Sequence, residues 1–166
     1  MSDSTWRASD LALETGVQLR ARGWLLASAE SCTGGMIGAA ITDIAGSSAW
    51  FDRGFITYSN EAKIELLGVS AELIATAGAV SEVVAHAMAA GALAHSRANA
   101  SVSVTGIAGP GGATAGKPVG MICFGWAFRD GPVTTETRYF DGDRAAIRAE
   151  TVRHSLQGLI DRLRRV

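Results

Sequence analysis

The chain has 166 residues, a length that fits a single domain with a substantial core, so we predict one domain over 1–166 with a loosely ordered stretch at 1–9. The formal net charge of −1 gives no electrostatic argument for binding nucleic acid, and no apolar run approaches the roughly 20 residues that span a bilayer. Two cysteines without metal-ligand spacing favour a reducing compartment, so we expect a cytoplasmic protein without a disulfide framework.

The period of the apolar residues and the capping residues predict alternating strands and helices. The first half follows the order of parallel strand–helix units, and the last part contains a hairpin with strong turn residues at 129–132. The predicted helices are 10–22, 36–43, 61–67, 70–77, 82–97 and 143–163, and the predicted strands are 24–26, 50–58, 100–105, 119–128 and 133–140. We therefore expect an α/β fold, a three-layer α/β/α domain with a mixed parallel and antiparallel sheet.

The segment 27–38 forms a polar elbow between a predicted strand and a predicted helix. Such an elbow leaves N–H groups without partners beside the positive end of the helix dipole, where they can bind an oxyanion or a phosphate. Gly34 and Gly35 would let a substrate approach the backbone closely. We interpret Ser31 as a nucleophile at this helix start; the alternative is that Ser31 or Thr33 only caps the helix.

A lysine is the candidate for the base that activates Ser31. The three histidines all fall inside predicted helices without a catalytic or metal-binding motif. Lysine can lose its proton near neutral pH in a dry pocket and arginine cannot, and only Lys63 and Lys117 are lysines among the 15 basic residues. Lys63 would lie in the first turn of its helix, where the positive helix end favours the neutral amine.

Three neighbours of these residues are also candidates for the site. Tyr58 ends a predicted strand and could share a proton relay with Lys63, with ordinary strand packing as the alternative. Cys32 is a rival nucleophile beside Ser31, although small buried cysteines are common. Glu30 could act as a second acid or contact a cationic ring.

The strand 100–105 leads into the glycine-rich loop 106–118. Within it, 111–117 fits the start of a P-loop, but Pro118 replaces the required Ser or Thr and a strand follows, so hydrolysis of a nucleoside triphosphate is not expected. The loop N–H groups could bind one phosphate, with a long turn between strands as the alternative. Both the elbow and this loop follow the carboxyl ends of strands, where ligands gather in such sheets.

Five ordered blocks of sequence together resemble the CinA C-terminal domain family over about 11–163. The blocks are AESCTGG (29–35), GFITYSNEAK with LLGV (54–63 and 66–69), GAVS (78–81), TGIAGPGG (105–112) and KPVG (117–120). The resemblance implies that the protein hydrolyses the carboxamide of nicotinamide mononucleotide to nicotinic acid mononucleotide and ammonia. The implied mechanism is a serine–lysine–tyrosine mechanism, carried by Ser31, Lys63 and Tyr58.

In this mechanism neutral Lys63 takes the Ser31 hydroxyl proton, directly or through Tyr58, and no metal or organic cofactor is needed. The expected partner is a small nucleotide, without nucleic acid or membrane. The residues predicted to hold the oxyanion or the substrate are Glu30, Cys32, Thr33, Gly34, Gly35, Thr105, Gly106, Gly109, Pro110 and Gly111.

Two other functions stay open at this point: a catalytically silent nucleotide-binding or regulatory oligomeric module, and a different amidase or esterase. We also expect a homo-oligomer. Trp50 and Phe51, next to a predicted turn, hint at a subunit contact, with core packing as the alternative.

Overall fold

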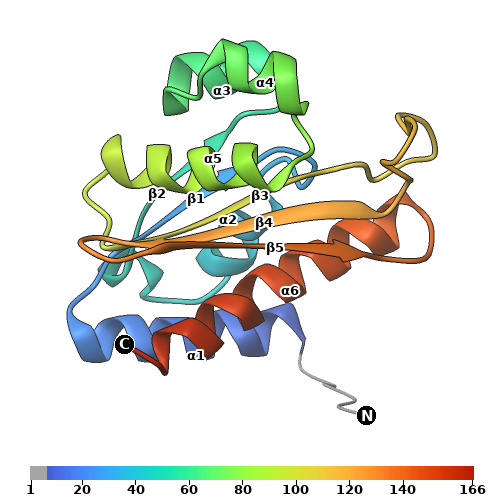
Figure 1. The fold of residues 1–166 in the computed structure, drawn as a ribbon. Helices are drawn as coiled ribbons and strands as arrows, with labels where there is room; N and C mark the ends of the chain where they lie inside the picture. Colours follow the sequence, from blue (N-terminus) through green and yellow to red (C-terminus); the bar gives the residue numbers. More distant parts are fainter. Residues whose placement is uncertain (1–6) are drawn as a thin grey trace.

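The computed structural model describes residues 7–166, which build a five-stranded sheet with helices on both faces (Figure 1). The arrangement confirms the predicted three-layer α/β/α fold with a mixed sheet. The strands are β1 (Leu26–Glu30), β2 (Phe51–Ile56), β3 (Ala100–Gly106), β4 (Met121–Phe128) and β5 (Val133–Tyr139). The helices are α1 (Ala8–Arg22), α2 (Met36–Thr42), α3 (Asn60–Leu67), α4 (Ala71–Ala77), α5 (Glu82–Ala94) and α6 (Arg144–Leu163), and the 3₁₀ turn η1 (Ser47–Ala49) precedes β2.

The sheet has the strand order β2-β1-β3-β4-β5. Strands β1, β2 and β3 are parallel, and β4 and β5 continue the sheet as the predicted antiparallel hairpin. Parallel neighbours end at the same edge of a sheet, so the segments that follow β1, β2 and β3 meet there. The elbow and the glycine-rich loop both begin at this edge.

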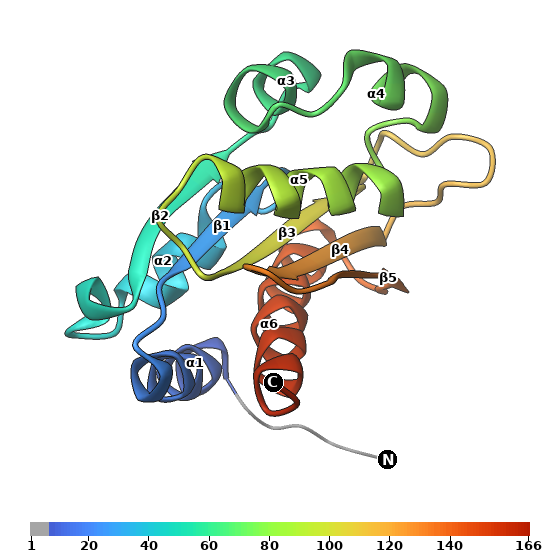
Figure 2. The same ribbon diagram turned by 60° about the vertical axis from the view of Figure 1, so that its left-hand side comes forward.

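Two hydrophobic cores join the sheet to its helices (Figure 2). Helices α1, α2 and α6 cover one face, where Leu19, Ile41 and Leu156 belong to the same core as Trp126 of β4. Helix α5 covers the other face, and α3 and α4 lie on its outer side (Figure 2). The α3–α4 pair is therefore held to the sheet mainly through α5.

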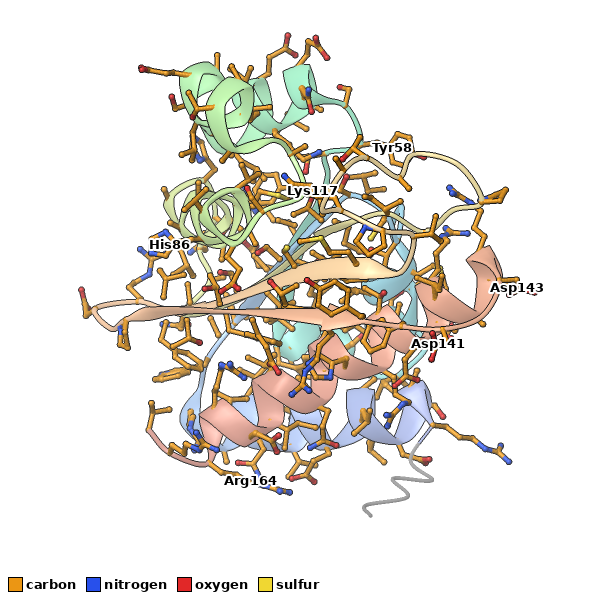
Figure 3. All side chains as sticks on the ribbon, turned by 45° about the vertical axis from the view of Figure 1, so that its right-hand side comes forward. Tyr58, His86, Lys117, Asp141, Asp143 and Arg164 are labelled. Carbon is orange, nitrogen blue, oxygen red and sulfur yellow. The ribbon has the colours of Figure 1, made fainter. Side chains whose placement is uncertain are left out.

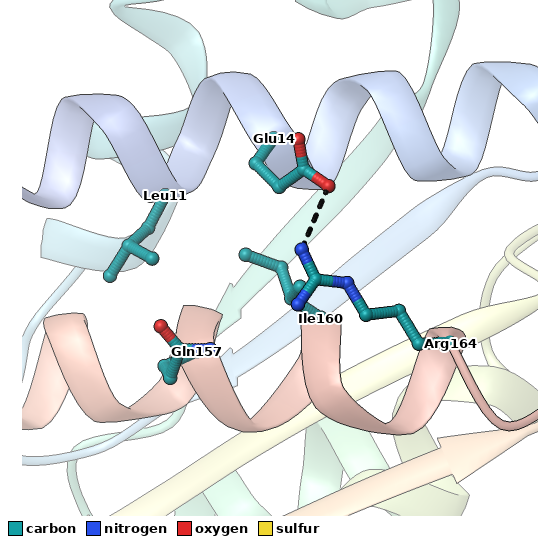
Figure 4. A pocket seen from close by; sticks show the side chains of 5 residues that line it. All are labelled: Leu11, Glu14, Gln157, Ile160 and Arg164. Atoms are coloured by element: carbon teal, nitrogen blue, oxygen red, sulfur yellow. Dashed lines mark hydrogen bonds and ion pairs between the residues drawn. The ribbon is translucent and has the colours of Figure 1, made fainter. Parts of the chain in front are cut away.

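Helices α1 and α6 lie side by side below the sheet. A narrow cleft of about 120 Å³ between them is crossed by an ion pair, with Arg164 Nη2 3.3 Å from Glu14 Oε1 (Figure 4). Exposed pairs of this kind contribute less than about 1 kcal/mol, so the apolar contacts carry this interface. Within residues 7–166, no helix combines the length and the apolar character needed to cross a bilayer.

Strand β1 differs from its prediction, because it begins at Leu26 and runs to Glu30 instead of covering 24–26. All five of its residues are buried. Its small side chains, Ala27, Ser28 and Ala29, lie between helix layers on both sides of the sheet, and this packing explains why a polar-looking segment is a strand. The elbow is correspondingly shorter and begins at Ser31.

Several other element boundaries moved by a few residues. Helix α1 begins at Ala8, inside the stretch 1–9 predicted to be loosely ordered, and residues 1–6 of that stretch lie outside the described residues. Helix α3 begins at Asn60, one residue before the predicted start at 61, and it is capped by Ser59, whose Oγ accepts from the Ala62 N–H at 3.0 Å. Trp50 is buried in the core, which confirms core packing over the hint of a subunit contact.

Candidate active site

Ser31 is the first residue after β1, at the carboxyl edge of the parallel strands. Its N–H donates to the Val104 carbonyl at 3.1 Å, and its carbonyl accepts from the Gly34 N–H at 3.0 Å. These two bonds tie the elbow to β3 and close it into a tight turn. Ser31 is thereby fixed in the turn that joins β1 to α2, ahead of the Gly35 N-cap, and not in the first turn of the helix itself.

Glu30 stabilises the start of α2 instead of facing a substrate. Its Oε1 accepts from Thr33 Oγ1 at 2.6 Å and from the Ile37 N–H at 2.8 Å, and its Oε2 accepts from the Gly38 N–H at 3.0 Å. A carboxylate at this place satisfies N–H groups that the helix leaves free and complements its dipole. The Glu30 carboxylate and the Thr33 hydroxyl therefore hold the elbow, and the predicted roles of these two residues toward the oxyanion or the substrate stay predictions.

Lys63 reaches Ser31 from α3. Its side chain is 1% exposed, and its Nζ lies 3.1 Å from Ser31 Oγ. The same nitrogen donates to the carbonyl oxygens of Thr57 and Tyr58 at 2.8 and 3.4 Å. Burial lowers the pKa of the Lys63 amine, because removing an ammonium ion from water disfavours the charged form.

Cys32 is buried beside Ser31, and burial raises the pKa of its thiol to about 12. A thiol with that pKa stays protonated at neutral pH and is a poor nucleophile. The structure therefore favours Ser31 over Cys32 as the nucleophile.

A pocket of about 270 Å³ opens beside Ser31 and Lys63. It contains six of the residues predicted for the site and five that were not predicted. The predicted lining residues are Ser31, Cys32, Tyr58, Lys63, Thr105 and Gly106, and the others are Asn60, Ala79, Val80, Ala108 and Arg144. The predicted residues Glu30, Thr33, Gly34, Gly35, Gly109, Pro110 and Gly111 do not line it.

The Tyr58 phenol does not sit between Ser31 and Lys63. Its side chain is 63% exposed, and its hydroxyl accepts a long hydrogen bond from Arg144 Nη2 at 3.4 Å. Figure 3 shows Tyr58 on the side of the sheet that carries α3 and α4. Tyr58 reaches Lys63 only through its backbone carbonyl, so the geometry does not support the predicted relay through the phenol.

Two arginines of α6 complete the site, and sequence reasoning missed both. Arg144 lines the pocket and donates through Nη1 to the Gly109 carbonyl at 2.9 Å. One turn later, Arg148 donates to the carbonyls of Cys32 and Thr33 at 3.0 and 3.2 Å. Their spacing of four residues at the start of an amphipathic helix was the available signal, but nothing local indicated which loops they would contact.

The glycine-rich loop contributes mainly its first residues. Gly109 takes φ +79°, and a Cβ there would lie 2.5 Å from Val119 Cγ1, so this turn requires glycine. Pro110 and Gly111 are exposed. Lys117 donates to the Ala77 carbonyl at 2.7 Å, at the end of α4, and not to a phosphate site (Figure 3). In residues 7–166 no three or more His, Cys, Asp or Glu side chains are grouped to hold a metal ion.

Comparisons with known proteins agree on one family. The family model of the CinA C-terminal domain matches residues 8–163. The nicotinamide-nucleotide amidohydrolase PncC of Enterobacter agglomerans is 57% identical over 151 residues, covering 91% of this chain and 92% of that protein. PncC of Escherichia coli strain K12 is 50% identical over 159 residues, covering 96% and 95%. The crystal structure of the competence/damage-inducible protein CihA from Agrobacterium tumefaciens matches with a TM-score of 0.91 at 49% identity, covering 97% of this chain and 98% of that one. The chain therefore belongs to the CinA C-terminal domain family.

Proposed function

We propose that this protein is a nicotinamide-nucleotide amidohydrolase, which converts nicotinamide mononucleotide to nicotinic acid mononucleotide and ammonia. One observation carries the proposal: a buried lysine amine lies 3.1 Å from a serine hydroxyl in the turn between β1 and α2, and both residues line an open pocket. Serine with a lysine base is a known way of activating an acyl-transfer nucleophile. The names of the two PncC relatives supply the substrate.

The geometry around Lys63 suits direct proton transfer. A neutral amine has two N–H groups, and the carbonyls of Thr57 and Tyr58 can accept both of them. The nitrogen lone pair then faces the Ser31 hydroxyl. As Ser31 Oγ bonds to the amide carbon, its proton moves to Lys63 Nζ, and the resulting ammonium later donates that proton to the leaving nitrogen.

Ammonia leaves as the carbon–nitrogen bond breaks, and the nicotinoyl group stays on Ser31 as an ester. Lys63, neutral again, takes a proton from water as the water oxygen attacks the ester carbon. The bond to Ser31 Oγ breaks, the proton returns to that oxygen, and the acid product leaves.

The backbone of the elbow offers donors for the oxyanion of both tetrahedral intermediates. The Gly34 N–H is already bonded to the Ser31 carbonyl. The Cys32 N–H contacts only its own thiol sulfur, a weak acceptor, and the Thr33 N–H has no acceptor among the described residues. A trans peptide directs its N–H away from the preceding carbonyl, so Arg148, by binding the Cys32 carbonyl, sets the direction of the Thr33 N–H. We assign the oxyanion to Cys32 and Thr33, each worth roughly 3–4 kcal/mol where such donors were removed elsewhere.

Arg144 is the proposed contact for the substrate phosphate. Besides Lys63 it is the one cation among the residues that line the pocket. Two of its five N–H donors bind the Gly109 carbonyl and the Tyr58 hydroxyl. The other donors of the planar guanidinium are available to bind phosphate oxygens. In this proposal the phosphate is held by an arginine that contacts the glycine-rich loop, instead of by the N–H groups of the loop as predicted.

Ammonia release from nicotinamide mononucleotide tests the function. Ser31→Ala and Lys63→Ala should each lower turnover by about 10³-fold or more, whereas Ser9→Ala, an exposed serine of α1, should have no effect. Binding of the nucleotide without ammonia release, even at high enzyme concentration, would instead favour the silent regulatory module. A substrate panel separates other amidases and esterases, and the homo-oligomer stays a prediction that sedimentation of the wild type can check.

A further inference from the structure

Asn60 has a free carboxamide at the mouth of the pocket. It is the first residue of α3, one position after the N-cap, where an asparagine side chain often caps a helix. Here Ser59 already caps α3 through its bond to the Ala62 N–H. Asn60 therefore has no capping role in α3, and it lines the pocket.

The other polar side chains that line the pocket are already hydrogen-bonded. Ser31 contacts Lys63, Thr105 Oγ1 donates to the Ala79 carbonyl at 2.8 Å, and Arg144 joins Gly109 to the Tyr58 hydroxyl. Within residues 7–166, the Asn60 carboxamide makes no hydrogen bond. Its full set of two donors and one acceptor is therefore available to a bound molecule.

The position of Asn60 indicates which part of a substrate it would meet. Asn60 and Lys63 are three residues apart on α3, so they share one face of the helix. The Lys63 amine contacts Ser31, and the reacting carbon must lie next to that pair. Asn60 lines the same pocket as this pair and lies about one helical turn before Lys63, which places it beside the residues that would meet the reacting carbon.

We propose that Asn60 recognises the substrate carboxamide, its Oδ1 accepting a hydrogen bond from the amide N–H and thereby turning the carbonyl carbon toward Ser31 Oγ. The inference rests on the proposed amidohydrolase function. An uncharged side chain suits this place, because a carboxylate there would pair with Lys63 and hold it in its charged form. Asn60 would thus select a carboxamide while leaving the base neutral.

Two substrates that differ only in the leaving group test the proposal: nicotinamide mononucleotide and the methyl ester of nicotinic acid mononucleotide. The ester has no N–H to donate, so Asn60 can help only the amide. In Asn60→Ala we expect kcat/KM for the amide to fall by about 10–100-fold and that for the ester to stay within about threefold of the wild type. Glu65→Gln, an exposed change on the same helix, should alter neither.

Asn60→Asp gives a second readout that a structural role would not produce. Its carboxylate can still accept from the amide N–H, but it favours the charged lysine, so the rise of kcat/KM with pH should move to higher pH. An unchanged amide-to-ester ratio in Asn60→Ala, or an equal loss on both substrates, would overturn the inference. No ammonia from the wild type would overturn the proposed function, and this inference with it.

Discussion

Lys63 is a buried amine without an acidic partner. Among the described residues no carboxylate forms an ion pair with it, and burial lowers its pKa below the ordinary lysine value of 10.5. Only the neutral amine accepts a proton from Ser31, so kcat/KM should rise with pH through that lowered pKa. A profile measured between about pH 6 and 10 checks this, and a flat or falling profile over that range would contradict it.

Lys63→Arg separates charge from basicity at the same residue. A guanidinium cannot lose its proton, so this variant should lose about 10²-fold or more of kcat at every pH. Lys117→Arg is the matched control, because its contact with the Ala77 carbonyl needs only a donor. Substantial activity in Lys63→Arg would show that position 63 is not the base.

Tyr58→Phe distinguishes the predicted proton relay from the observed geometry. The phenol has only a long contact with Arg144, and its ring is mostly exposed. We expect kcat to fall by less than about fivefold and KM to rise by a similar factor, as for the loss of one weak hydrogen bond. Steady-state kinetics with nicotinamide mononucleotide measure both constants. A loss of kcat of about 10²-fold would instead support the predicted proton relay through the Tyr58 phenol.

At the scale of elements, α6 fixes the elbow after β1. Arg148 donates to two carbonyls of that elbow, and its removal leaves both without this partner. Arg148→Met should destabilise the fold by about 1–3 kcal/mol and lower kcat, because the Thr33 N–H loses its fixed direction. Denaturant unfolding and ammonia release measure the two effects, with the exposed Arg165→Met as control; full activity would contradict this role.

The sequence predicted those parts of the site that depend on local pattern. The helix start after β1, the position of Lys63 in α3 and the hairpin turn follow from nearby residues, and the Ser31–Lys63 contact was expected. The contact between Arg148 and Cys32 joins residues 116 positions apart, and no local pattern specifies it. Strand β1 was misjudged because Glu30 looks like a loop residue until α2 is seen to occupy its carboxylate.

At the scale of the whole molecule, the two residues of the proposed catalytic pair belong to different layers. Ser31 follows a central strand, whereas Lys63 belongs to α3, on the outer side of α5 (Figure 2). The distance between them therefore depends on how closely α3 approaches α5. Gly91 of α5 sets this approach, because a Cβ there would lie 2.2 Å from the carbonyl oxygen of Leu67, the last residue of α3.

Gly91→Ala should push α3 outward and separate Lys63 from Ser31. Overpacking of this kind costs about 1–3 kcal/mol of stability, and here kcat should fall as well. Gly16→Ala is the matched control: its Cβ would lie 2.7 Å from Trp50 Cε2, so it should destabilise α1 on the opposite face of the sheet, in a helix that carries no residue of the site. Both variants are compared by denaturant unfolding and by kcat at a temperature where each is folded. Equal loss of kcat in both would show that general stability, and not the spacing of α3 and α5, governs the pair.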